Sequence, residues 1–141
     1  QDPGNLGTMI RTGEGAGITG VIMNQQTVDI FNPKTIRATM GSIFRVPFVY
    51  VPELSPMLTQ MHEKGIHTYA AHLKGQKYYD SFSFREPTAF LIGNEGNGLT
   101  KEISDQAGQY LKIPMEGKVE SLNASIAAAL LMYEAHRQRN L

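Results

Sequence analysis

The stretch Phe90-Leu91-Ile92-Gly93-Asn94-Glu95-Gly96-Asn97-Gly98-Leu99 joins an apolar run directly to a turn rich in glycine and polar residues. Residues 88–92 predict a buried strand, and the glycines predict a tight turn with positive φ angles. Ligands of open α/β sheets bind beyond the carboxyl ends of the strands. The turn at residues 93–98 is therefore a candidate ligand site, with a purely structural turn as the alternative.

Helix and strand patterns alternate on both sides of this stretch. Further strands are predicted at residues 21–23, 46–51, 66–71 and 110–113, and helices at residues 6–12, 32–40, 53–64, 100–107 and 121–137. Asn5 and Ser121 are the expected N-caps of the first and last helices. Strands separated by helices of this length indicate an α/β fold, with a mostly parallel sheet and helices on both faces.

The bulk properties limit the class of protein. The 141 residues suit one domain, and the opening turn and helix lead us to expect a strand upstream of residue 1. The start has no signal-peptide pattern, and no apolar run approaches the roughly 20 residues of a membrane helix. The absence of cysteine excludes disulfides and fits a cytoplasmic protein. Zero formal net charge argues against a domain that holds nucleic acid by bulk positive charge alone.

Three other motif interpretations are weak. Residues 15–20 spell G-x-G-x-x-G, but a helix precedes them and a strand follows, which reverses the order of a dinucleotide site. The turn at residues 93–100 resembles a P-loop, yet Leu99 replaces the phosphate-binding lysine, which argues against a nucleotide-hydrolysing enzyme. Metal-ligand spacing is absent around the four histidines, which are His62, His67, His72 and His136.

Two polar residues permit two interpretations each. Arg11 is either a cation near a helix C-terminus, favoured by the helix dipole, or a phosphate-binding guanidinium. Asn123 is expected in the first turn of the last helix, where its amide serves either the backbone or a ligand.

Three segments resemble the signature motifs of the SpoU/TrmH family of RNA methyltransferases. They are Asn5-Leu6-Gly7-Thr8-Met9-Ile10-Arg11-Thr12 with the preceding Asp2-Pro3-Gly4, the stretch 90–99, and residues 113–117 with Ser121-Leu122-Asn123-Ala124-Ser125-Ile126-Ala127. Their order and spacing fit the family, and the resemblance covers nearly the whole chain. Small departures occur at Gly13, Ala124 and Ile126, where alanine, valine and valine are more usual.

The resemblance implies a fold and a set of site residues. Residues 1–141 would form one catalytic domain with a deep C-terminal trefoil knot, which is rare among folds, and would assemble as a homodimer. The implied cofactor is S-adenosylmethionine, bound by Gly93, Ile113, Leu122, Met115 and Ala70. The implied catalytic residues are Arg11, Asn5, Glu95, Ser121 and Asn123.

The implied reaction is methyl transfer to a ribose 2′-hydroxyl of structured RNA, with ribosomal RNA favoured over transfer RNA and no metal required. The family assigns deprotonation of the hydroxyl to the arginine, here Arg11. Because an arginine side chain is almost always protonated and acts as a donor, stabilisation of the developing alkoxide is the alternative. We expect RNA recognition to depend on an additional N-terminal domain. The rival interpretation is a knotted module that binds S-adenosylmethionine or RNA but does not catalyse a reaction.

Overall fold

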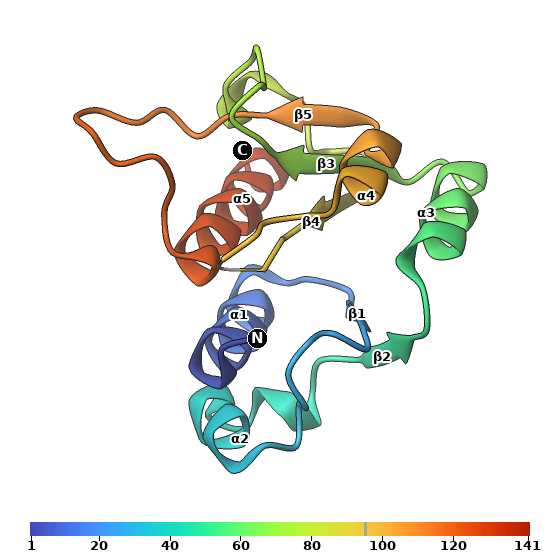
Figure 1. The fold of residues 1–141 in the computed structure, drawn as a ribbon, viewed down its shortest axis with the longest axis vertical. Helices are drawn as coiled ribbons and strands as arrows, with labels where there is room; N and C mark the ends of the chain where they lie inside the picture. The colour runs from blue at the N-terminus through green and yellow to red at the C-terminus, as the bar shows by residue number, and fades with distance from the viewer. Residues whose placement is uncertain (95) are drawn as a thin grey trace. The chain divides into compact units, whose positions relative to one another are not determined.

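The computed structural model describes residues 1–94 and 96–141, which divide into two compact units, Gln1–Leu54 and Ser55–Leu141 (Figure 1). Every strand pair in the described residues is parallel, as the sequence predicts. The strands form two sheets, β1-β2 and β4-β3-β5, instead of one. The α/β class is thus confirmed, and the expectation of a single sheet is corrected because each unit pairs its own strands.

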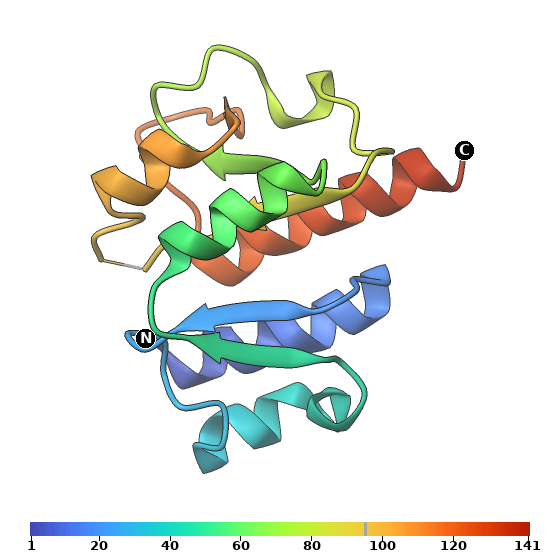
Figure 2. The same ribbon diagram turned by 90° about the vertical axis from the view of Figure 1, so that its right-hand side faces the viewer.

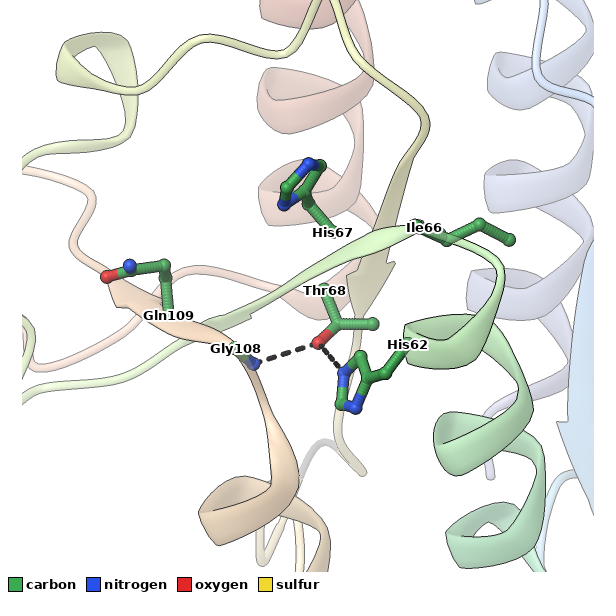
Figure 3. Close-up of a pocket in the computed structure, with 7 residues that line it drawn as sticks. His62, Ile66, His67, Thr68, Gly108 and Gln109 are labelled. Carbon is green, nitrogen blue, oxygen red and sulfur yellow. Dashed lines mark hydrogen bonds between the residues drawn. The ribbon is translucent and has the colours of Figure 1, made fainter.

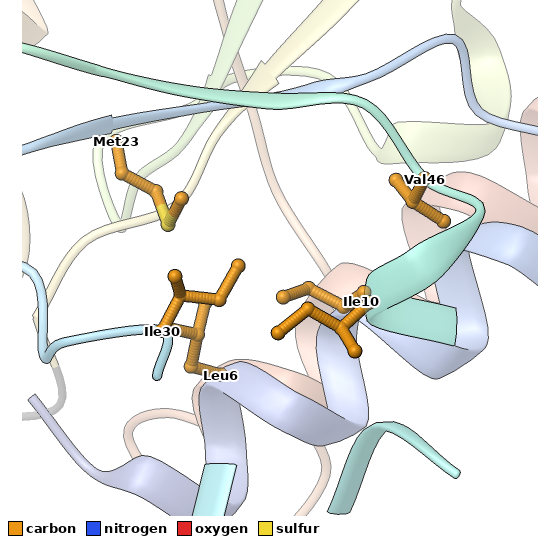
Figure 4. Close-up of a cluster of buried hydrophobic side chains, with 6 residues drawn as sticks. Leu6, Ile10, Met23, Ile30 and Val46 are labelled. Carbon is orange, nitrogen blue, oxygen red and sulfur yellow. The ribbon is translucent and has the colours of Figure 1, made fainter. Parts of the chain in front are cut away.

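The N-terminal unit contains a two-stranded sheet and two helices. Its elements are α1 (Pro3–Ala16), β1 (Val21–Asn24), α2 (Pro33–Thr39), the 3-10 turn η1 (Ser42–Phe44) and β2 (Phe48–Val51). Its buried core consists of Leu6, Ile10, Met23, Ile30, Ile43 and Val46, and Figure 4 shows side chains of α1 pointing toward Met23 of β1. The helices approach closely at Gly7, where an added Cβ would lie 2.5 Å from the Cβ of Ala38.

Helix α1 is longer than the sequence predicts and begins earlier. Asp2 is its N-cap and accepts a hydrogen bond from the Asn5 N–H at 2.9 Å, so the expectation that Asn5 caps the helix is wrong. The helix continues through Gly13 and Gly15 to Ala16, and its C-cap Gly17 has a left-handed φ of 81°. Arg11 therefore lies in the middle of α1, and the helix dipole does not account for it.

The C-terminal unit contains the three-stranded sheet. Its elements are α3 (Leu54–Glu63), β3 (His67–Ala71), the 3-10 turn η2 (Tyr79–Ser81), β4 (Thr88–Leu91), α4 (Lys101–Gln106), β5 (Gln109–Leu111) and α5 (Ala124–Arg139). β3 is the central strand, and α5 runs alongside β4 (Figure 1, Figure 2).

Helices cover both faces of this second sheet. Tyr69 of β3 belongs to the same buried cluster as Leu131 of α5, whereas the neighbouring Thr68 bonds to His62 of α3. Successive residues of a strand point to opposite faces, so α5 and α3 lie on opposite faces of β3. The predicted arrangement of helices is confirmed for this unit.

Both ends of α5 are fixed by side chains. Asn123 is the N-cap, with its amide oxygen accepting from the N–H groups of Ser125 and Ile126 at 2.9 and 3.4 Å. The expected cap, Ser121, lies two residues outside the capping position, so that prediction is wrong.

At the other end of α5, the buried Gln138 accepts from the Phe84 N–H at 2.6 Å and donates to the Phe82 carbonyl at 2.9 Å. Arg139 donates to the carbonyls of Phe84 and Glu86, each at 2.9 Å. We call these four bonds the C-terminal latch. They tie the last turn of the helix to the segment that leads into β4.

Candidate functional site

The carboxyl ends of β3, β4 and β5 form one edge of the three-stranded sheet. Ala70 is fully buried and stands in register with Leu91 of β4 and Tyr110 of β5. Gly93 and Ile113 each lie two residues beyond the last residue of their strands. Because the strands are parallel, three of the cofactor-binding candidates converge at this edge.

The glycine turn after β4 folds back on itself. The Gly98 N–H donates to the Asn94 carbonyl at 2.8 Å, and the Asn94 side chain accepts from the Gly96 N–H at 2.7 Å. An added Cβ at Gly93 would overlap the backbone of Gly98 and Leu99, and Gly98 has a φ of 67°. Glycine is therefore required at both positions by the backbone. The catalytic candidate Glu95 lies outside the described residues.

The segment after β5 is held by the loop that follows β3. The Lys112 N–H donates to the Lys77 carbonyl at 3.0 Å, and the Tyr79 N–H donates to the Lys112 carbonyl at 2.9 Å. We call these two hydrogen bonds the clasp on Lys112. Further along the chain, Met115 and Leu122 are half-buried, and Ser121 is exposed. The clasp fixes where the chain leaves the sheet, one residue before Ile113.

The two remaining candidates, Asn5 and Arg11, lie on α1 in the N-terminal unit. Asn5 is half-buried, and Arg11 is exposed and forms no hydrogen bond or ion pair with the residues that the structure describes. The guanidinium of Arg11 therefore keeps its donors for a ligand, which suits a phosphate or another anion.

One helical turn beyond Arg11, Glu14 links α1 to η1. Its carboxylate accepts from the Ser42 hydroxyl at 2.6 Å and pairs through both oxygens with the Arg45 guanidinium, with one N–O distance of 2.9 Å. These donors stabilise the charged form and lower the pKa of Glu14 to about 2. No local sequence pattern predicts this network, because its members are 28 and 31 residues apart.

A hollow of about 260 Å³ lies at the opposite, amino edge of the same sheet (Figure 3). Two of its polar side chains, those of His62 and Thr68, are engaged in the fold, since the Thr68 oxygen accepts from the Gly108 N–H and bonds His62, both at 2.8 Å. Open α/β sheets bind ligands at the carboxyl edge. We therefore place the candidate site at that edge and not in the hollow.

Within residues 1–94 and 96–141, no cluster of three or more acidic, histidine or cysteine side chains is arranged to hold a metal ion. None of the helices in the same ranges has the length and apolar character needed to cross a membrane.

A parallel sheet with loops converging at its carboxyl edge defines an α/β ligand-binding protein. The profile of the SpoU rRNA Methylase family matches residues 1–133, and the chain belongs to this family. The expected resemblance is thereby confirmed.

Several proteins that are similar to this chain are named as RNA methyltransferases. A Bacillus subtilis relative, 23S rRNA (guanosine(2553)-2'-O)-methyltransferase RlmP, is 38% identical over 133 residues, which is 94% of this chain and 53% of the relative. The crystal structure of an rRNA methyltransferase from Sinorhizobium meliloti is 39% identical with a TM-score of 0.89, covering 96% of this chain and 52% of that one. The SpoU methyltransferase AviRb from Streptomyces viridochromogenes, in complex with the cofactor AdoMet, is 34% identical with a TM-score of 0.92 and covers 99% and 54%. The chain thus spans about half the length of these relatives.

Proposed function

We propose that residues 1–141 form the catalytic domain of an S-adenosylmethionine-dependent methyltransferase that acts on a ribose 2′-hydroxyl of RNA. The observation that carries the proposal is the convergence of Ala70, Gly93 and Ile113 at one sheet edge in a chain of the SpoU family. The name of the Bacillus subtilis relative favours ribosomal RNA as the substrate.

The residues at the carboxyl edge fit S-adenosylmethionine chemically. The buried Ala70 and the half-buried Ile113, Met115 and Leu122 are apolar and suit an adenosine, while the turn around Gly93 offers backbone groups. The bound cofactor would supply a methyl group already activated by its sulfonium. A polyphosphate ligand fits less well, because Leu99 stands where a P-loop has lysine.

The catalytic residues would act mainly by orientation and electrostatics. Arg11 would hold an RNA phosphate and stabilise negative charge as the 2′-hydroxyl loses its proton. Asn5 would position the ribose from the same helix. Asn123 commits its amide oxygen to capping α5, so its contribution is to fix the segment that carries Ser121. Glu95 is proposed as a further polar residue of the site on the family resemblance alone.

The trefoil knot is also part of the proposal. The loop after β3 forms hydrogen bonds with Lys112, the residue that follows β5. The C-terminal latch ties α5 to the part of the same loop that leads into β4. These two sets of bonds support the proposal that the C-terminal part of the chain is threaded through this loop.

We further propose a homodimer and a cytoplasmic location, where ribosomal RNA is available. Three apolar side chains of α5, Ile126, Leu130 and Tyr133, are 51%, 37% and 46% exposed. Their spacing of four and three residues places them on one stripe of the helix. An exposed apolar stripe of this kind supports packing against a second copy.

Methyl transfer can be tested with full-length protein, tritiated S-adenosylmethionine and ribosomal RNA that has not been methylated by this enzyme. We expect label in the RNA and, after alkaline hydrolysis, label in a dinucleotide, because a 2′-O-methyl group blocks cleavage of the adjacent phosphodiester. Labelled mononucleotides would instead show methylation of a base, and no label in any RNA would contradict the proposed function.

The site itself is tested by two glycine variants of the same turn. Gly93→Ala should abolish saturable binding of S-adenosylmethionine in calorimetry, since the added methyl group displaces the turn. Gly96→Ala is the matched control, because the nearest atom to its added Cβ is 3.5 Å away. Equal affinities in the two variants would remove Gly93 from the proposed site.

A further inference from the structure

Residues 30–52 contain Lys34, Arg37 and Arg45 and no acidic residue, in a chain whose formal net charge is zero. The same stretch exposes large apolar side chains, with Phe44 86% and Met40 67% exposed. Cations interleaved with an exposed aromatic ring are typical of surfaces that bind single-stranded nucleic acid.

The turn that carries Phe44 is fixed by its neighbours. Met40 and Gly41 both have left-handed backbones, with φ of 49° and 89°. Ile43, directly before Phe44, and Val46, two residues after it, are buried, at 8% and 6% exposed. Arg45 is tied to Glu14 of α1. Phe44 is thus held outward by a turn whose flanking residues are anchored in the core.

This turn lies beside Arg11. Gly7, Arg11 and Glu14 are spaced by four and three residues and share one face of α1. Gly7 contacts α2, and Glu14 bonds Ser42 and Arg45 of the turn. Arg11 is between these two contacts, on the side of α1 that faces α2 and η1. Arg11, Arg37, Met40, Phe44 and Arg45 together are called the Phe44 surface.

We propose that the Phe44 surface binds a single-stranded segment of the RNA substrate, with an unpaired base stacked on Phe44 and neighbouring phosphates held by Arg11 and Arg37. The proposal rests on the proposed methyltransferase function and identifies which part of the domain contacts RNA. Both arginines are exposed, and neither forms an ion pair with the described residues. Arg45 is neutralised by Glu14 and serves to hold the turn. Unpaired bases are the usual targets of sequence-specific RNA recognition, and aromatic rings stack on them.

A tryptophan probe tests the stacking directly, because these 141 residues contain no tryptophan. In full-length Phe44→Trp protein, with any tryptophan outside these residues replaced by phenylalanine, a short single-stranded oligoadenylate should quench the fluorescence saturably. The same strand paired with oligouridylate should not, since its bases are already stacked. Equal quenching by both forms, or none by either, would overturn the proposal.

Kinetics of Phe44→Ala provide the second test, with Phe31→Ala as the matched control. Phe31 is also exposed, at 61%, but precedes the opposite end of α2. We expect the KM for RNA to rise about ten-fold in Phe44→Ala only, with the affinity for S-adenosylmethionine unchanged. An unchanged KM, or conversion of a dimer to monomers by Phe44→Ala, would contradict the proposal. Quenching of Phe44→Trp by RNA without methyl transfer by the wild type would instead refute the proposed function and leave the surface standing.

Discussion

Among the proposed site residues, Arg11 is the one whose structural environment most restricts its chemical role. It lies in the middle of α1, exposed, and forms no hydrogen bond or ion pair with the residues that the structure describes. A guanidinium carries five N–H donors and no acceptor, so without a partner in the fold it is suited to bind an anion. Its surroundings favour the role of an anion-binding donor over that of a proton acceptor.

Arg11→Ala should therefore lower kcat for methyl transfer by about 100-fold or more, the usual cost of losing a donor to a developing oxyanion. The affinity for S-adenosylmethionine and the thermal unfolding temperature should stay unchanged, because no described contact of the fold is removed. Methyl-transfer assays, calorimetry and melting curves on one preparation check this. Turnover equal to that of the wild type would remove Arg11 from the mechanism.

Individual site residues could be predicted only where the local sequence determines the conformation of the backbone. Gly93 was identified because a glycine turn directly follows an apolar strand. The helix caps were misassigned because each motif offers two capable residues, Asp2 and Asn5 in one, Ser121 and Asn123 in the other. For α1 the proline after Asp2 was the missed signal, since proline favours the first helical position, as it does after Asn32.

At the scale of elements, the Glu14 network joins α1 to the turn before β2. The carboxylate is held in its charged form by Arg45 and Ser42, so the bond between the two elements depends on ionisation. The positions of the helices and strands were largely predictable from apolar periodicity. The contact between α1 and η1 was not, because it depends on side chains brought together only by the fold.

Acid should weaken this contact in a defined pH range. The pKa of Glu14 falls from 4.5 to about 2 on folding, so its stabilising contribution is full above pH 4.5 and is lost as the pH falls toward 2. We expect the unfolding temperature of Glu14→Gln to change less than that of the wild type between these limits. Because the Glu14 side chain is only partly buried, at 32% exposure, and its partner Arg45 is 57% exposed, solvent screens the pair and the difference should be small. Melting curves across this range measure it, and parallel pH profiles would contradict it.

At the scale of the whole molecule, each unit has its own parallel sheet and its own buried cluster. Alternating helices and strands predicted the α/β class but not the strand order β4-β3-β5, in which β3 separates two strands that follow one another in sequence. Strand order depends on contacts between distant segments, such as the clasp on Lys112, for which one sequence contains no local signal.

Assembly can be tested on the apolar stripe of α5. Leu130→Glu should raise the dimer dissociation constant by at least about ten-fold, because a charge would be buried against the partner copy. Leu73→Glu is the matched control in the same unit, since Leu73 is 68% exposed and lies outside α5. Sedimentation velocity distinguishes the outcomes. A Leu130→Glu protein that dimerises as tightly as the control would exclude this stripe as the interface.

The position of β3 in the centre of its sheet has a consequence for synthesis on the ribosome. Contacts of the N-terminal unit lie within 54 residues, so it can fold soon after it leaves the exit tunnel. The second unit cannot fill its core until Leu111 and Leu131 have both emerged. Until then Tyr69 and its aromatic neighbours are exposed. Nascent chains stalled between β4 and α5 should therefore bind chaperones, whereas chains stalled shortly after release of the N-terminal unit should already be protected from protease.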